Sequence, residues 1–259
     1  MEISCVTASY AADLLGYPGN IDWSLAHETI IQTPLLETVE SILNRLKPAR
    51  LDGIELWFPH IWPAKITPVL AGKIRRRLHE LGMVCSACAG SVGNPDKDFY
   101  GSEAIFQTTR LLDAPLIAGH FESGAVPALG NLCARYGIWA AFENGLEKNV
   151  AEIRAAIQDD NPWIGANLDT GNLAAQGGDP VKALRDLGNR IMHVHVKDVP
   201  EVGSHRCVAV GSGIVDVRGI VRELKRNDYD GWLSIEIETE DHDPTDEIIA
   251  SVEILRSLV

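Results

Sequence analysis

The sequence predicts an α/β fold, a (β/α)8 TIM barrel, on the strength of three observations. The length of 259 residues is typical of one such barrel. Short apolar segments alternate with amphipathic segments along the whole chain, as in parallel strands joined by helices. Polar residues stand at the carboxyl ends of at least five of the apolar segments, where a barrel carries its site. The expected strands are ISCVTA (3–8), GIELW (53–57), MVCSAC (83–88), PLIAGH (115–120), IWAAFE (138–143), IGANLD (164–169), IMHVHV (191–196) and WLSIEI (232–237).

Several helices between these strands carry a start signal, in which a capping residue precedes a proline suited to the first turn. The dipeptides of this kind are Thr67-Pro68, Asp179-Pro180 and Asp243-Pro244. The alternation would also fit an open doubly wound sheet, but no G-x-G-x-x-G motif follows the first strand. Because no linker or low-complexity segment interrupts the pattern, we expect residues 1–259 to form a single TIM-barrel domain.

Composition and charge restrict the class of protein. Hydrophobic residues make up 46% of the chain and charged residues 23%, which is the balance of an ordinary folded protein. The formal net charge of −13 disfavours nucleic acid as a partner, because most of the surface would repel its phosphates. No apolar run is long enough to span a membrane, and the first residues lack the pattern of a signal peptide. We expect a cytoplasmic protein without a membrane partner, and the sequence leaves open whether it forms a homo-oligomer.

The cysteines favour the same compartment. Five cysteines, an odd number, indicate a reducing cytosol rather than a disulfide framework. Cys85 and Cys88 form a C-x-x-C motif, but it lies in an expected strand, whereas a redox pair would stand at the start of a helix. Since positions i and i+3 of a strand face opposite sides, we expect two separate, buried and inert thiols.

The principal candidate site consists of one residue at the end of each of the last four expected strands. These residues are Glu143 in AFENG, Asp169 in NLDTGN, His195 in HVHVKD and Glu236 in LSIEIE. Any one of them alone could make an ordinary hydrogen bond at a strand end. Together, the three carboxylates and the imidazole call for a cation among them, because the carboxylates would otherwise repel one another. The donor set suits Mn²⁺, Mg²⁺ or Co²⁺, with Zn²⁺ as an alternative. We expect one divalent metal ion, with Mn²⁺ as the first choice.

The sequence resembles the xylose isomerase-like TIM barrel superfamily, the sugar phosphate isomerases and epimerases. The segments that carry this resemblance are LDGIELW (51–57), AFENG (141–145), LDTGN (168–172), HVHVKD (193–198), VGSGIVD (210–216) and YDGWLSIEIE (229–238). The resemblance implies that Glu143 and Glu236 both bind the metal and transfer protons. It implies that Asp169 and His195 bind the metal only.

The chemistry of these residue types fits a metal-dependent sugar isomerase or epimerase, or a related lyase. Its substrate would be a small keto-sugar, sugar phosphate or polyol. A cation bound to a ketone oxygen acidifies the neighbouring C–H, a carboxylate removes that proton, and the cation stabilises the resulting enediolate. Return of the proton to the same carbon gives epimerisation, and return to the neighbouring carbon gives isomerisation. Loss of a β-hydroxyl group gives dehydration.

Two other functions are weighed against this one. An apurinic-site endonuclease would need several metals, more histidines at the barrel rim and a basic DNA-binding face. Asn172 stands where many members of the superfamily carry a histidine, and together with the acidic net charge this counts against the endonuclease. A barrel that binds a sugar without turnover is the third reading, and the presence of both Glu143 and Glu236 argues against it.

Five further residues are candidates for binding the substrate: Glu55, Trp57, His120, Lys197 and Arg206. Glu55 would bind a substrate hydroxyl or make a structural hydrogen bond inside the barrel mouth. Trp57 would stack on a sugar or pack against the barrel wall. His120 ends the fourth strand, where rim histidines often act on substrates. Lys197 and Arg206 are two candidates to replace an arginine that the superfamily's epimerases carry after the strand-seven histidine.

Overall fold

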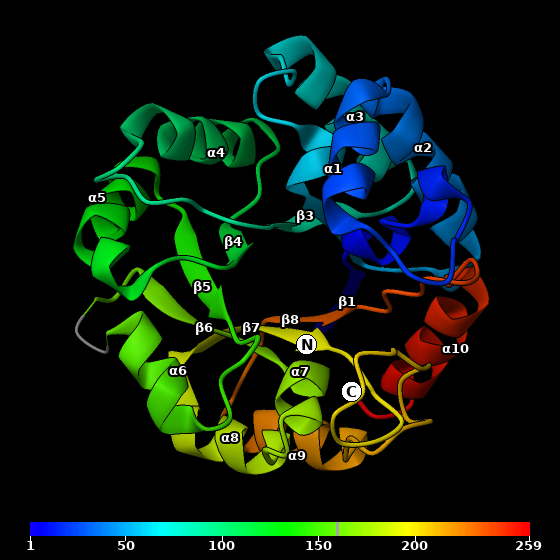
Figure 1. Ribbon diagram of the computed structural model, residues 1–259, viewed down its shortest axis with the longest axis vertical. Coiled ribbons are helices and arrows are strands. Elements are labelled where there is room, and N and C mark those ends of the chain that lie inside the picture. Colours follow the sequence, from blue (N-terminus) through cyan, green and yellow to red (C-terminus); the bar gives the residue numbers. More distant parts are fainter. Residues whose placement is uncertain (159–160) are drawn as a thin grey trace.

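In the computed structural model, which describes residues 1–158 and 161–259, eight parallel strands form one sheet that curves into a barrel (Figure 1). The order of the strands is β1-β8-β7-β6-β5-β4-β3-β2, and a parallel bridge between Val6 and Glu55 links β1 to β2. The predicted fold class is therefore confirmed. The strands are β1 (Glu2–Cys5), β2 (Gly53–Trp57), β3 (Val84–Ala89), β4 (Leu116–Gly119), β5 (Trp139–Glu143), β6 (Ile164–Asp169), β7 (Ile191–Val196) and β8 (Trp232–Ile235).

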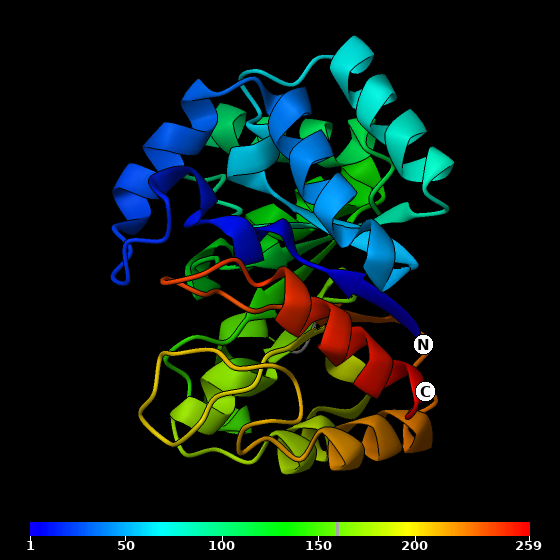
Figure 2. The same ribbon diagram turned by 90° about the vertical axis from the view of Figure 1, so that its right-hand side faces the viewer.

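Helices form a ring around the strands, and α10 runs beside β1, from the opposite end of the chain (Figures 1 and 2). No helix of the described residues has the length and apolar character needed to cross a membrane. The α-helices are α1 (Trp23–Gln32), α2 (Leu35–Leu46), α3 (Pro68–Glu80), α4 (Phe99–Leu111), α5 (Val126–Tyr136), α6 (Val150–Ile157), α7 (Thr170–Ala175), α8 (Pro180–Leu187), α9 (Val217–Arg226) and α10 (Thr245–Arg256). The 3-10 helices are η1 (Thr7–Tyr10), η2 (Asp13–Leu15), η3 (Lys47–Ala49), η4 (Phe58–Ile61), η5 (Ser123–Ala125) and η6 (Gly188–Arg190).

Two of the three predicted helix starts are confirmed. The side chains of Thr67 and Asp179 each accept a hydrogen bond from a backbone N–H in the first turn of α3 and α8. The prediction for α10 was wrong by one position, because the helix begins at Thr245 and Pro244 is the residue before it. The Asp243 carboxylate still accepts a hydrogen bond from the Thr245 N–H at 2.9 Å, so it serves the start of this helix from one residue further away.

Three strands, β2, β6 and β7, have the predicted bounds, and the others differ by a few residues at their ends. β1 ends at Cys5 because the chain then winds into η1. β8 ends at Ile235, because the backbone N–H of Ile237 donates to the Ser9 hydroxyl at 3.1 Å. Glu236 therefore lies just beyond β8, although its N–H still donates to a carbonyl of β7 at 3.3 Å.

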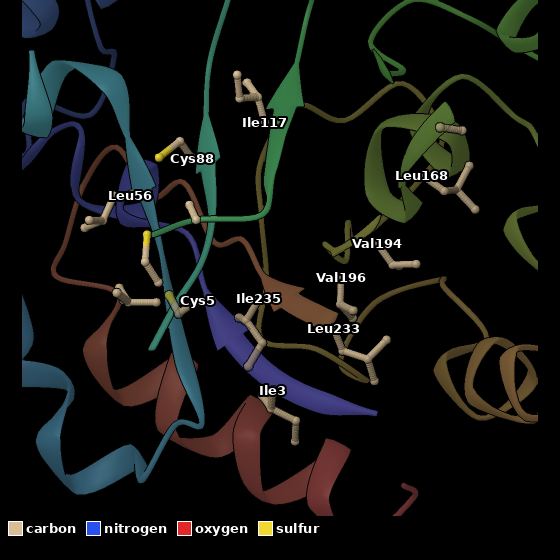
Figure 3. Close-up of a cluster of buried hydrophobic side chains, with 14 of the residues drawn as sticks. Ile3, Cys5, Leu56, Cys88, Ile117, Leu168, Val194, Val196, Leu233 and Ile235 are labelled. Atoms are coloured by element: carbon tan, nitrogen blue, oxygen red, sulfur yellow. The ribbon is translucent and has the colours of Figure 1, made fainter. Parts of the chain in front are cut away.

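The two faces of the strands carry different side chains. The outward face is apolar and packs against the helices (Figure 3). Buried residues on this face include Ile3, Cys5, Leu56, Cys88, Ile117, Leu168, Val194, Val196, Leu233 and Ile235. The residues that alternate with them include the buried polar side chains Ser4, Glu55, Asn167, His193, His195 and Ser234. Because successive residues of a strand face opposite sides, these polar groups point into the barrel, where they can support a site.

A β-bulge in β3 overturns the predicted separation of Cys85 and Cys88. Cys85 pairs with Ile54 and Cys88 with Leu56, so Ser86 is an extra residue in β3. Ile54 and Leu56 share a face of β2, and the two cysteines therefore share a face of β3. Within the described part of the chain all five cysteines are buried and free, as expected of structural thiols.

Candidate metal centre

Four side chains from the last four strands meet at the carboxyl end of the barrel. Glu143 ends β5, Asp169 ends β6, His195 is the penultimate residue of β7, and Glu236 follows β8. One ligand atom from each residue lies within 4.8 Å of the others. The side chains of Asp169, His195 and Glu236 are almost fully buried, whereas that of Glu143 is 12% exposed. The structure thus brings together the four residues that the sequence suggested as metal ligands.

Three atoms of this cluster have no hydrogen-bond partner in the described part of the chain, although two of them lie within ion-pair distance of the Lys197 ammonium group. Asp169 Oδ2, His195 Nδ1 and Glu236 Oε2 are buried without a hydrogen-bond partner among the described residues. His195 Nδ1 lies 3.2 Å from Glu236 Oε2 and 3.6 Å from Glu143 Oε1. Buried polar atoms in native proteins are usually satisfied, so lone pairs that converge in this way form a group that could hold a metal ion. Three carboxylates and one imidazole suit a divalent ion such as Mn²⁺, Mg²⁺, Co²⁺ or Zn²⁺.

The pKa values reflect the same concentration of negative charge. Burial and the carboxylates of Glu236 and Glu143 together raise the pKa of Asp169 to about 7, against the opposing effect of Lys197. Burial acts to lower the pKa of His195, but the carboxylates around it raise the pKa well above the ordinary value. The negative charge that the carboxylates concentrate at this point contributes to both upward shifts.

Lys197 supplies one positive charge beside the cluster. Its Nζ lies 3.2 Å from Asp169 Oδ2, 3.0 Å from Glu236 Oε2 and 2.9 Å from Glu238 Oε2, and its side chain is only 6% exposed. Lys197 follows His195 by two residues, so both point to the interior of the barrel. Burial raises the pKa of Glu236, but Lys197 and His195 together lower it well below its usual range. The Glu236 carboxylate is thus held ionised.

The D-T-G-N motif positions Lys197 as well as its own aspartate. Asp169 Oδ1 accepts a hydrogen bond from the Asn172 N–H at 2.8 Å and so caps α7. Thr170 donates its hydroxyl to the Lys197 carbonyl at 2.7 Å and accepts from the Lys197 N–H at 3.1 Å. A Cβ atom at Gly171 would lie 2.5 Å from Lys197 Cγ, so the glycine leaves room for the lysine stem. Each residue of the motif therefore has a structural task at this site.

Glu55 joins two histidines from the opposite side of the barrel. Its carboxylate lies 2.8 Å from His193 Nε2 and 3.1 Å from His195 Nε2, and it is fully buried. Burial raises the pKa of Glu55, but the two imidazoles lower it well below its usual range. This pairing directs the Nε2 proton of His195 to Glu55 and its Nδ1 lone pair to the cluster. Both carboxylate oxygens of Glu55 are therefore engaged in structural hydrogen bonds inside the barrel, which is one of the two roles expected for this residue.

The other residues suggested for substrate binding lie at separate places beyond or at the carboxyl ends of the strands. The ring of His120 is exposed, and its Nδ1 lies 3.0 Å from the Glu143 carbonyl oxygen. Trp57 is half-buried at the end of β2. Arg206 is exposed and lines a cavity of about 210 Å³ together with Glu238, so it lies beside the cluster rather than in it. Of the two basic residues considered, Lys197 alone contacts the proposed ligands in the part of the chain that the structure describes.

Sequence reasoning missed two residues of the site. Glu238 contacts Lys197, and its pKa is raised to about 7 by burial and by the neighbouring Glu236 carboxylate. Glu238 follows Glu236 by two residues, a spacing that puts both on one face of an extended segment. The expected strand ended at residue 237, so this spacing was not used. Asn144 exchanges two hydrogen bonds with the backbone of Asp169, at 2.9 and 3.0 Å, and so fixes the ends of β5 and β6 against each other.

Comparison with known proteins places this geometry in a family. Residues 125–258 match the model of the xylose isomerase-like TIM barrel family. The chain belongs to that family. An inosose dehydratase of Lactiplantibacillus plantarum is 27% identical over 129 residues, which are 42% of this chain and 43% of that protein. The match thus spans less than half of the length of this relative.

Two solved structures of sugar epimerases share the fold of this chain. The 3-keto-D-glucoside 4-epimerase of Escherichia coli has a TM-score of 0.69 and 18% identity, and the alignment covers 99% of both chains. The D-allulose 3-epimerase of a Methylomonas species, solved in complex with D-allulose, has a TM-score of 0.68 and 16% identity, with 100% of this chain and 97% of that chain covered. At these identities the likeness concerns the fold alone.

Proposed function

We propose that this chain is a divalent-metal-dependent enzyme that moves a proton at a carbon next to the carbonyl of a small sugar-like substrate. The observation that carries this proposal is the meeting of two carboxylates of different exposure, Glu143 and Glu236, with Asp169 and His195 around one point at the barrel mouth. Names of relatives support the substrate class, since they include inosose dehydratases and sugar epimerases. Mn²⁺ is the first ion to test.

The ion would be held by Glu143, Asp169, His195 and Glu236. When bound, a divalent cation polarises a carbonyl group and acidifies the neighbouring C–H. Glu143 is the ligand most open to the mouth, so its carboxylate can reach a proton on the substrate. Glu236 stays ionised beside Lys197 and accepts or returns a proton on the opposite side of the substrate. These two glutamates form the proposed proton-transfer pair.

Lys197 gives the site a proton donor in addition to its two glutamates. Its ammonium group touches Asp169, Glu236 and Glu238, so it lies at the edge of the space where a substrate oxygen would bind. There it can donate a hydrogen bond to a substrate hydroxyl, and in a dehydration it can assist the departure of that group. The fate of the substrate therefore depends on which atom receives the returned proton.

The decisive experiment is deuterium exchange. Protein depleted of metal and then loaded with Mn²⁺ is incubated in D₂O with keto-sugars, keto-inositols and sugar phosphates, and NMR follows each product. We expect deuterium at a carbon next to the carbonyl, with at least about a hundredfold slower exchange in Glu143→Gln. The absence of ion-dependent exchange or dehydration in every substrate would contradict the proposal. Nicking of an abasic DNA duplex by the same preparation would favour the endonuclease instead.

A further inference from the structure

A cavity of about 720 Å³ lies at the rim beside β2 and β3, away from the strands that carry the proposed ligands. Its walls come from the start of α1, the segment from the end of β2 to Ala64, and the start of α4 with the loop before it. This volume lies within the range of pockets that hold small organic molecules. The residues that matter for the argument are Trp23, His27, Trp57, Trp62 and Ser102.

Trp57 lies on the same strand as Glu55, which contacts the metal centre, and it also lines the cavity. It follows Glu55 by two residues on β2, so both side chains point to the interior, and Glu55 touches His195 at 3.1 Å. The Trp57 ring packs against Val6 and Ala89, at the ends of the neighbouring strands, and its other side lines the cavity. Trp57 thus stands between the inner face of β2, which carries Glu55, and the cavity.

The walls suit a flat, uncharged ring. Trp23 stands edge-on to Trp57, with the ring centroids 6.1 Å apart, and His27 stands edge-on to Trp62 at 5.2 Å. Aromatic faces of this kind bind the C–H faces of sugars and the faces of other aromatic rings. No lysine or arginine is among the described residues that line the cavity, and Asp98 contributes a carboxylate, so a phosphate group is disfavoured.

An unpartnered hydroxyl group in the cavity is independent evidence for a ligand. Ser102 is 2% exposed and lines the cavity, and its Oγ has no hydrogen-bond partner among residues 1–158 and 161–259. A side chain at Gly93 would cover it, because a Cβ there would lie 3.0 Å from Ser102 Oγ. The glycine thus keeps the space beside the hydroxyl free of a side chain, and buried hydroxyls normally have a partner.

We propose that this cavity is a subsite for a second, neutral ring joined to the reacting sugar, so that the substrate is a glycoside rather than a free monosaccharide or a sugar phosphate. This proposal rests on the proposed function for the identity of the reacting ring. The reacting ring lies over the metal centre, the glycosidic bond passes Trp57, and the second ring lies between Trp23 and Trp62 near Ser102. The second ring is a sugar or an aromatic group.

Binding of nonreacting probes tests the subsite without turnover. Calorimetry on the Mn²⁺-loaded protein compares phenyl β-D-glucopyranoside and cellobiose with D-glucose and glucose 6-phosphate. We expect at least one two-ring probe to bind about tenfold or more tightly than both one-ring probes. The Trp23→Ala variant should reduce this preference to less than about threefold. The matched control is Trp139→Ala, because Trp139 is 44% exposed and Trp23 is 42% exposed, but Trp139 starts β5 at the other end of the barrel.

Further variants and the deuterium-exchange experiment distinguish the possible results. A Ser102→Ala loss confined to cellobiose assigns the second ring to a sugar, whereas a loss of phenyl glucoside alone in Trp23→Ala assigns it to an aromatic group. Equal binding of one-ring and two-ring probes, or an unchanged preference in Trp23→Ala, overturns the subsite. If the preference and its dependence on Trp23 stand while neither keto-sugars nor their glycosides exchange deuterium, the proposed function fails and the subsite holds. If free keto-sugars exchange as fast as their glycosides, the function holds and the subsite fails.

Discussion

The two halves of the barrel differ in what stands at the rim. In the second half the strand ends carry Glu143, Asp169, His195 and Glu236, and the family model matches residues 125–258. In the first half Trp57 packs with Val6, Ala8 and Ala89 at the strand ends, and the cavity lies there. The difference suggests a division of labour in which the second half conducts the chemistry and the first half selects the substrate. Variation in the first half would then change specificity while the reactive centre stays the same.

The largest expected effect comes from Asp169→Asn, in the second half. The amide can still cap α7, so the fold should persist, but it removes a negative ligand from the cluster. We expect the variant to lose the bound ion at micromolar protein concentrations. The rate of deuterium exchange into the substrate should fall by about a thousandfold or more. Metal analysis and deuterium exchange measure the two effects. Asp179→Asn, which alters the cap of α8 in the same way, is the control and should keep both properties.

The second prediction tests whether the first half contributes to the metal centre at all. Glu55 is the one residue of β2 that reaches a proposed ligand in the described structure, at His195 Nε2. In Glu55→Gln the neutral amide holds that imidazole more weakly, and we expect the ion to bind about 10 to 100 times more weakly. Competition with a chelator measures the affinity. Glu80→Gln, at an exposed ion pair on α3, should leave it unchanged. An unchanged affinity in Glu55→Gln would confine the metal centre to the second half.

Lys197→Met separates charge from packing. Methionine keeps most of the stem that lies over Gly171 but removes the ammonium group beside Asp169. Because a positive charge repels a divalent cation at the same carboxylates, we expect ion affinity to rise by about tenfold while exchange slows. Lys182→Met, at a surface pair, should change neither quantity. A weaker affinity in Lys197→Met would mean that the lysine positions the ligands rather than competing with the ion.

The sequence could predict the second half better than the first, for physical reasons. Apolar and polar residues alternate toward the ends of β6 and β7. This alternation alone placed Asp169 and His195 on the inner face. The bulge at Ser86 could not be predicted in this way, because it is set by the pairing of β3 with β2. The cavity also escaped prediction, since its walls come from three segments that are distant in the sequence.

The smallest expected effect concerns the stability of the first half at acid pH. His60 in η4 is buried beside Trp57, and burial lowers its pKa to about 3; the Asp13 carboxylate opposes this shift, whereas the Arg45 charge adds to it. In the unfolded chain this histidine takes up a proton near pH 6.5. Between these values the unfolded state binds more protons, so the free energy of unfolding falls as the pH is lowered. This group contributes at most about 1.4 kcal/mol per pH unit.

The His60→Asn variant should remove that contribution, although it also costs stability at neutral pH through lost packing. Urea unfolding at pH 6.5, 5.5 and 4.5 gives the difference in unfolding free energy between the two proteins, and we expect it to shrink as the pH falls. Parallel pH profiles would show that the imidazole is protonated in the folded protein too. The aromatic wall behind Trp57 would then tolerate a buried charge, which an apolar subsite for a neutral ring should not. The stability measurement therefore bears on the character of the first half as well as on its folding.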